Sequence, residues 1–125
     1  MLYAFREESD LPEETALKIT CGLGAGMARK EEVCGAVTGG ILVLGLRHGR
    51  GSKDDKSAME LTYLKTRKLM DRFADKHGTF ICRKLLNGCE LTTEEGQKYF
   101  KENELLKKIC VPCVRSVVEI LEDIM

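Results

Sequence analysis

The stretch VCGAVTGGILVLGL, residues 33–46, is the longest apolar run of the chain and decides which kind of fold the chain can adopt. Glycines and a threonine interrupt it, and it covers only 14 residues. A helix that crosses a bilayer needs about 20 consecutive, predominantly apolar residues. We therefore interpret this stretch as a helix buried in a protein core, and we expect no membrane insertion.

The segments on either side of this run also carry helical signals. Pro12 precedes two glutamates, and Thr92 precedes Glu95 by three residues, which are patterns of helix starts. Glycines that follow the apolar run and the next long segment, Gly49 and Gly78, are typical helix stops. The helices that these signals and the apolar periodicity predict cover residues 10–20, 30–48, 56–77, 80–86, 92–102 and 110–124.

The pattern predicts an all-α fold, a compact bundle of five to six helices. No segment alternates between apolar and polar residues for long enough to indicate a strand. A chain of 125 residues is the usual size of one domain, so we expect a single helical domain over residues 1–125. The connections are short, which favours antiparallel packing of consecutive helices.

The overall composition is that of a globular protein with no excess of either charge. Twenty Lys and Arg residues balance twenty Asp and Glu residues. The chain therefore lacks the excess of positive charge that favours binding to nucleic acid, and we expect no nucleic acid partner. The first ten residues, MLYAFREESD, lack the pattern of a signal peptide, and we expect a cytoplasmic location. Six cysteines stand out, because thiols in a reducing compartment are often metal ligands or redox groups.

Two cysteines lie at the predicted start of the last helix, in the string Cys110-Val111-Pro112-Cys113. Unpaired N–H groups and the positive end of the helix dipole should lower the pKa of both thiols. This spacing suits a catalytic dithiol pair or half of a four-thiolate metal site. The alternative is that both thiols are small hydrophobic groups on the buried face of the helix.

Cys34 begins the string CGAVTGG, in which Gly35 and Gly39 lie about one helical turn apart. Bare backbone at these glycines lets either a neighbouring helix or an inorganic cluster approach the main chain. Cys82 falls in the first turn of a predicted short helix, where it serves as a thiolate ligand or as a core residue. Core roles are the default for the two remaining cysteines, Cys21 and Cys89.

Three parts of the chain together resemble a known family. They are CGLGAGMARKEEVCGAVTGGILVLGLRHG at residues 21–49, CRKLL at residues 82–86, and the cysteine at 110 before VRSVVEILEDI. The chain is similar over its whole length to the C-GCAxxG-C-C family of redox-active proteins, and the most specific part is Cys34-Gly35-Ala36 with Gly39. The resemblance implies a small helical protein with four motif cysteines and a redox or iron–sulfur role. A similar domain accompanies the haem module of split-Soret cytochromes.

The resemblance places the second, third and fourth motif cysteines on Cys34, Cys82 and Cys110. The first has no counterpart, and residues 1–5, MLYAF, look like the tail of the family's first helix. We therefore expect that Met1 replaces an internal position and that the true start lies upstream. If it does not, the fourth thiol comes from one of three further cysteines, Cys113, Cys21 or Cys89.

The leading hypothesis is a redox protein in which thiolates hold an iron–sulfur cluster for electron transfer or sensing. Its predicted ligands are Cys34, Cys82, Cys110 and Cys113, with Gly35 and Gly39 beside the cofactor. Zinc would use the same ligands without electron transfer.

The second hypothesis is metal-free thiol–disulfide exchange, with a helix-terminal cysteine such as Cys110 attacking and Cys113 or another thiol resolving. The third is a helical interaction module with inert core cysteines. The residues leave open whether the chain is an enzyme such as an oxidoreductase. A redox partner protein is expected under the first two hypotheses, and a homodimer is compatible with each.

Overall fold

A computed structural model describes residues 1–6 and 10–125, and in this part of the chain helices are the only regular elements beside one isolated bridge. The longer helices are α2 (Glu13–Thr20), α4 (Gly35–His48), α5 (Lys56–His77), α7 (Glu94–Glu102) and α8 (Val111–Ile124). The short ones are α3 (Gly24–Met27), α6 (Cys82–Leu85), the 3-10 turn η1 (Cys21–Leu23) and the π-helical turn η2 (Leu106–Cys110). The predicted all-α class is confirmed.

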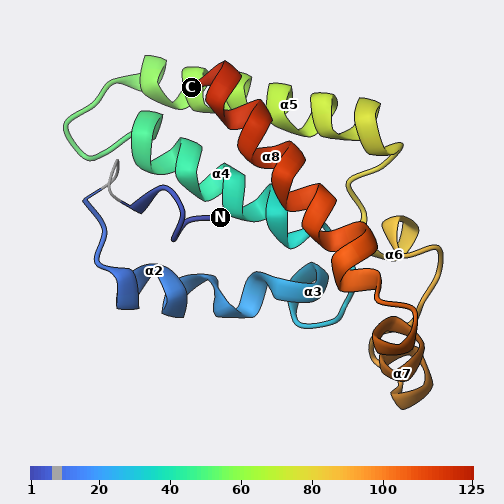
Figure 1. Cartoon of the computed structure of the whole chain (residues 1–125). Helices are drawn as coiled ribbons and strands as arrows, with labels where there is room; N and C mark the ends of the chain where they lie inside the picture. The colour runs from blue at the N-terminus through green and yellow to red at the C-terminus, as the bar shows by residue number, and fades with distance from the viewer. Residues whose placement is uncertain (7–9) are drawn as a thin grey trace.

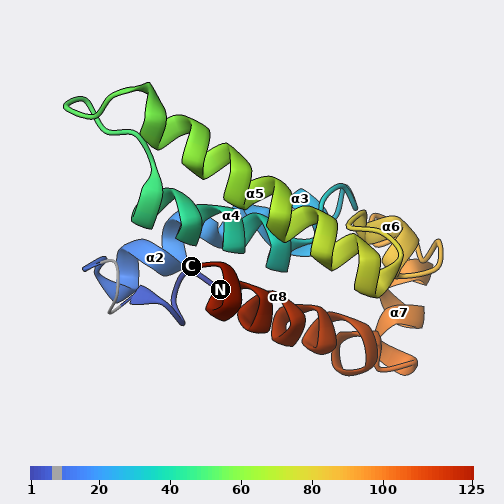
Figure 2. The ribbon, with the colours of Figure 1, turned by 90° about the horizontal axis from the view of Figure 1, so that it is seen from above.

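Three helices, α4, α5 and α8, pack against one another and form the centre of the molecule (Figures 1 and 2). α4 and α5 are antiparallel neighbours, and α8 crosses both. Six of their side chains are fully buried: Val37, Leu44, Leu69, Phe73, Val117 and Leu121. Gly40 permits this packing, because a Cβ there would lie 2.8 Å from Val117 Cγ1 and 2.9 Å from Leu69 Cδ2. The apolar run at residues 33–46 therefore supplies the central helix, as predicted.

The first part of the chain runs along a different side of α4, through α2, η1 and α3 (Figure 1). The backbone enters the left-handed region at Ala25, within α3, stays there to Arg29 and returns to it at Glu31. Gly26 is essential to this turn, because its φ is +66° and a Cβ would lie 2.6 Å from Glu31 Cα and 2.7 Å from Cys82 Cβ. The glycine-rich string at 22–26 thus brings this turn into contact with α6.

A second, smaller core lies where α6, α7 and η2 meet, at the end of the molecule where α8 begins (Figure 1). Its buried residues are Cys82, Leu86, Cys89 and Leu91. The Glu31 carboxylate, 2% exposed, closes this region: its Oε1 accepts hydrogen bonds from the Leu91 N–H at 3.0 Å and from Arg83 at 3.4 Å. One glutamate therefore connects the turn after α3 to the loop before α7.

Several predicted helix bounds are wrong in ways that matter for the cysteines. The central helix begins at Gly35, with Cys34 as its N-cap residue, and not at residue 30. The cap of α7 is Thr93, which accepts from the Gly96 N–H, and not Thr92. The helices predicted at 10–20 and 80–86 are shorter, at Glu13–Thr20 and Cys82–Leu85.

The end of the chain departs from prediction as well. Residue 110 does not start a helix, because η2 continues directly into α8. No helix among the described residues is both long and apolar enough to cross a bilayer.

Candidate functional site

Cys34 is held at the N-terminus of α4 by backbone hydrogen bonds on both sides. Its N–H donates to the Phe80 carbonyl at 2.8 Å, and its carbonyl accepts from the Val37 and Thr38 N–H groups at 2.9 and 3.1 Å. The preceding residue, Val33, forms an isolated antiparallel bridge with Ile81. This short pairing fixes Cys34 beside the start of α6, where Cys82 lies.

Cys110 and Cys113 reach the same region from the other end of the chain, on the continuous helix formed by η2 and α8. Pro112 is accommodated in the first turn of α8. Cys113 is 1% exposed and belongs to the central core, whereas Cys110 is half-buried and contacts the smaller core. The packing of α8 on α4 therefore presents two thiols to Cys34, one from the core and one from a more open position.

The Cys113 thiol donates a hydrogen bond to the sulfur of Cys34, and this contact is the main reason that the pKa of Cys34 is lowered to about 6. Burial opposes the shift, and the backbone N–H groups of Ala36 and Val37 add to it. The same hydrogen bond raises the pKa of Cys113, since that thiol must keep its proton to donate. Of the two, Cys34 carries the negative charge because it lies at a helix N-terminus.

The other thiols of the region stay protonated. Burial, followed by the charge of Cys34, raises the pKa of Cys82 to about 12 and also raises that of Cys110. The expectation that the pKa of Cys110 and Cys113 would be lowered by a helix N-terminus is therefore wrong. The physical reason is that the helix does not begin there: η2 precedes α8, so the positive end of the dipole lies further back along the chain.

Of the remaining two cysteines, Cys89 shares the smaller core with Cys82, whereas Cys21 belongs to neither core. The buried Cys89 thiol donates to the Gly96 carbonyl at 3.1 Å, and burial raises its pKa. Cys21 is exposed in η1. All six cysteines are free thiols.

The two glycines predicted to lie beside a cofactor have different surroundings. A Cβ on Gly39 would meet Met1 Cβ at 2.6 Å, so this glycine permits close packing of the chain's first residue. A Cβ on Gly35 would lie 3.1 Å from the Leu23 carbonyl oxygen, and Gly35 lines a cavity next to Cys34.

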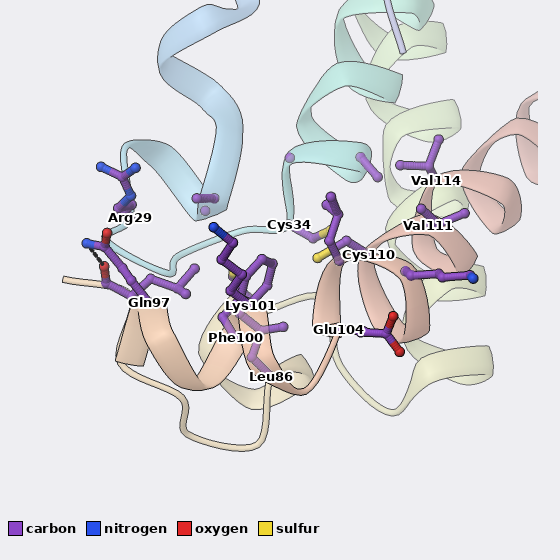
Figure 3. A pocket seen from close by; sticks show the side chains of 18 residues that line it. Arg29, Cys34, Leu86, Gln97, Phe100, Lys101, Glu104, Cys110, Val111 and Val114 are labelled. Carbon is purple, nitrogen blue, oxygen red and sulfur yellow. Dashed lines mark hydrogen bonds between the residues drawn. The ribbon is translucent and has the colours of Figure 1, made fainter. Parts of the chain in front are cut away.

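This cavity has a volume of about 830 Å³. Three of the four predicted ligand cysteines, Cys34, Cys82 and Cys110, are among its lining residues, whereas Cys113 lies behind the wall. Figure 3 shows Cys34 and Cys110 from α4 and the start of α8 on the same side of the cavity, opposite α7.

The predicted iron–sulfur or zinc site can be compared with this arrangement. Thiolates are the right donors for either. Nevertheless, no group of three or more Cys, His, Asp or Glu side chains in residues 1–6 and 10–125 is arranged to hold a metal ion. The geometry as it stands therefore does not fit a metal centre, although the four thiols lie near one another.

Sequence reasoning identified all four cysteines of this group but missed two features. The first is the buried Glu31, which the prediction placed at the start of a helix over residues 30–48. The second is that Cys34 is a helix cap and a thiolate. This was missed because the helix was predicted to begin at residue 30, whereas α4 begins at Gly35. The left-handed backbone at residues 25–31 had no signal beyond the glycines at 22, 24 and 26.

The comparisons with known proteins agree with the cysteine pattern. No curated protein and no solved structure matches the chain. The family described as "Putative redox-active protein (C_GCAxxG_C_C)" matches residues 1–124. The chain therefore belongs to the C_GCAxxG_C_C family of redox-active proteins.

Proposed function

We propose that this protein carries out thiol–disulfide exchange, with Cys34 as the attacking thiolate and Cys113 as the resolving thiol. The observation that carries the proposal is the hydrogen bond from Cys113 to Cys34, together with the pKa of about 6 that it gives to Cys34. At neutral pH Cys34 is then largely a thiolate, the form that attacks disulfides. This assignment replaces Cys110 by Cys34 as the nucleophile, because the pKa of Cys110 is raised.

The reaction proceeds in two displacements. The Cys34 thiolate attacks one sulfur of a partner disulfide, forms a mixed disulfide and releases the other sulfur as a thiolate, which takes a proton. Cys113 then gives up its proton and attacks the Cys34 sulfur, so that the Cys34–Cys113 disulfide forms and the second partner thiol leaves. In total, two electrons pass from the protein to the partner disulfide, together with one proton from Cys113 and one from solvent, because Cys34 begins as a thiolate. The reverse sequence oxidises a partner dithiol.

The position of Cys113 supports its role in the second displacement. Attack on a disulfide sulfur proceeds best in line with the bond that breaks. Cys34 lines the cavity, and Cys113 contacts it from the buried side. A mixed disulfide in the cavity would therefore be opposite the resolving thiol.

The partner is proposed to be a redox protein or a small disulfide, with a location in the cytoplasm. The direct test is oxidation of the protein, alkylation of the remaining thiols, and tryptic mapping by mass spectrometry. Cleavage after Lys and Arg leaves Cys34 on peptide 31–47, and Cys110 and Cys113 together on peptide 109–115. The proposal expects these two peptides to be linked, with the alkyl group on Cys110.

The outcomes that contradict this proposal can be distinguished in the same digest. A linked pair that carries the alkyl group on Cys113 would make Cys110 the resolving residue. A disulfide within peptide 109–115 would restore the Cys110–Cys113 pair predicted from the sequence. Cys34→Ser is the matched control, because it removes the proposed link without disturbing the other five cysteines.

A second candidate is the predicted iron–sulfur or zinc protein. It is favoured by one observation, the electrostatic proximity of Cys34, Cys82, Cys110 and Cys113. These thiols would have to rearrange to share a metal, so we derive no chemical step from it. Metal and acid-labile sulfide analysis of protein expressed and purified without oxygen tests this candidate, and full metal occupancy would favour it over the dithiol.

A further inference from the structure

The cavity beside Cys34 has the properties of a ligand site. Its volume of about 830 Å³ falls within the range of about 300 to 1,000 Å³ typical of small-molecule pockets. It lies between the turn after α3, the N-terminus of α4, the α6 to α7 region and the start of α8 (Figure 3). Residues distant in the sequence thus surround one space, into which Cys34 is open and from which Cys113 is shielded.

The walls of this cavity are mainly apolar. Aliphatic and aromatic side chains come from the α6 to α7 region and from η2 and α8; they are Leu86, Leu91, Phe100, Leu106, Val111 and Val114. Leu106 is 60% exposed, Val111 43% and Val114 42%, so the surface around the opening also leaves apolar groups in contact with water. An apolar ligand body would cover these groups, which gives a favourable burial free energy.

The charged residues that line the cavity have a positive balance. Three are cations, Arg29, Lys101 and Lys107, against two anions, the Glu104 carboxylate and the Cys34 thiolate. None of the three cations forms an ion pair within the described part of the chain. In Figure 3 Lys101 extends from α7 toward the side of the cavity on which Cys34 lies. An anionic group of a ligand would therefore be attracted to this side.

We infer that the cavity binds a small disulfide whose apolar body carries a carboxylate. This inference rests on the thiol–disulfide exchange proposed above. The apolar body would contact the α7 and α8 walls, the carboxylate would lie near Lys101, and one sulfur would meet Cys34. The chemistry is the exchange already balanced: the bound disulfide accepts two electrons and two protons and leaves as two thiols, while Cys34 and Cys113 become a disulfide.

The concave form of the site favours a small molecule over a protein partner. A protein loop that carries a cystine would contact mainly the exposed rim, whereas a compact ligand can reach the apolar walls that surround Cys34. A protein partner remains an outcome that the experiment can identify.

Binding is tested apart from redox chemistry by titrating the reduced protein with octanoate and with 1-octanol, followed by heteronuclear NMR. Both should shift resonances of the residues that line the cavity. Lys101→Gln should weaken octanoate about threefold to fivefold, the effect of one exposed ion pair, and leave 1-octanol unchanged. Lys98→Gln is the matched control, because Lys98 lies one turn earlier on α7 and does not line the cavity. Cys21→Ser should bind octanoate as the natural protein does, because Cys21 does not line the cavity.

The same variants then test exchange, in a Cys21→Ser background that removes the exposed thiol. The rate with 5,5′-dithiobis(2-nitrobenzoate), an aromatic disulfide with carboxylates, should saturate with concentration, and octanoate should compete. No octanoate shifts at the cavity, or equal effects of Lys98→Gln and Lys101→Gln, would overturn the inference. A cystine peptide that binds there without competition from octanoate would also overturn it. An unreactive Cys34 in a protein that still binds octanoate would instead refute the proposed function.

Discussion

The buried thiol of Cys113 donates a hydrogen bond to the sulfur of Cys34 at the N-terminus of α4. The two residues lie on different helices, and only the packing of α8 on α4 brings them together. The contact shifts the pKa values of two chemically identical thiols in opposite directions. It lowers the pKa of Cys34 and raises that of Cys113. A thiolate with a protonated neighbour is the arrangement that disulfide exchange requires.

Cys113→Ser should trap the first intermediate of exchange. Serine keeps a hydroxyl donor near Cys34 but cannot attack the mixed disulfide. After treatment with oxidised glutathione, mass spectrometry of a tryptic digest should show a stable glutathione adduct on peptide 31–47, whereas the natural protein resolves it. Cys110→Ser is the control and should still resolve the adduct; accumulation in Cys110→Ser alone would assign resolution to Cys110.

Stability should fall at alkaline pH because of Cys82. Its pKa is about 12 in the folded protein, against an ordinary value of 9.0, so the unfolded chain loses this proton first. The contribution is complete below pH 9 and declines as the pH rises from 9 to 12. Cys82→Ala should make the decline of the unfolding free energy less steep by about 1.4 kcal/mol per pH unit. Urea unfolding in reducing buffer at several pH values measures this slope.

Cys21→Ala serves as the control for that series. An exposed thiol is solvated in both the folded and the unfolded chain, so its removal should leave the slope unchanged. A slope that is the same in Cys82→Ala and in the natural protein would show that Cys82 is not held protonated by burial.

Gly26→Ala should destabilise the turn that carries the chain from α3 to Cys34. The new Cβ would lie 2.6 Å from Glu31 Cα and 2.7 Å from Cys82 Cβ, on a backbone with φ of +66°. We expect a loss of about 2 to 4 kcal/mol from the combined clash and left-handed strain. Gly22→Ala has nothing within 4 Å of the added Cβ and should change the free energy of unfolding little. Equal effects of the two substitutions would contradict the described turn.

Glu31→Ala should also destabilise the protein, because the Leu91 N–H and Arg83 both lose their acceptor. The expected loss is about 1 to 3 kcal/mol, the cost of leaving the buried Leu91 N–H without an acceptor, because Arg83 is half exposed and water can solvate it. Glu31→Gln keeps an oxygen acceptor for Leu91 and should cost less. Thermal or urea unfolding of both variants checks the order, and a larger loss in Glu31→Gln would contradict the role of Oε1.

The sequence was sufficient for the fold class and for the central helix. Glycines and apolar residues at 33–46 indicated a buried helix, and Gly40 is the position where α8 and α5 approach the backbone of α4. The bounds failed where tertiary contacts override local preference. Residues 30–34 read as the start of a helix, but the bridge of Val33 with Ile81 and the burial of Glu31 keep them extended or turned.

The cysteines of the candidate site could be predicted from the sequence. Which of them ionises could not. The CxPC string suggested a helix N-terminus at Cys110, whereas the preceding π-helical turn removes it and Cys34 takes the N-terminal position. Which thiol ionises depends on a hydrogen bond between α4 and α8, and no local pattern encodes it. Nothing in the local sequence distinguishes α7 from an ordinary surface helix. Lys101 and Phe100 line the cavity only because α7 faces Cys34 in the folded chain.

The pH dependence of Cys34 alkylation measures directly whether the hydrogen bond from Cys113 lowers the pKa of Cys34. Iodoacetamide labelling of peptide 31–47 in reduced protein, measured by mass spectrometry from pH 4 to 10, gives the pKa of Cys34 alone, because no other cysteine lies on that peptide. We predict a midpoint near pH 6 in the natural protein. In Cys113→Ala, without the donor, the midpoint should rise toward the ordinary thiol value of 9.0. A midpoint above pH 8 in the natural protein, or one unchanged in Cys113→Ala, would contradict the account.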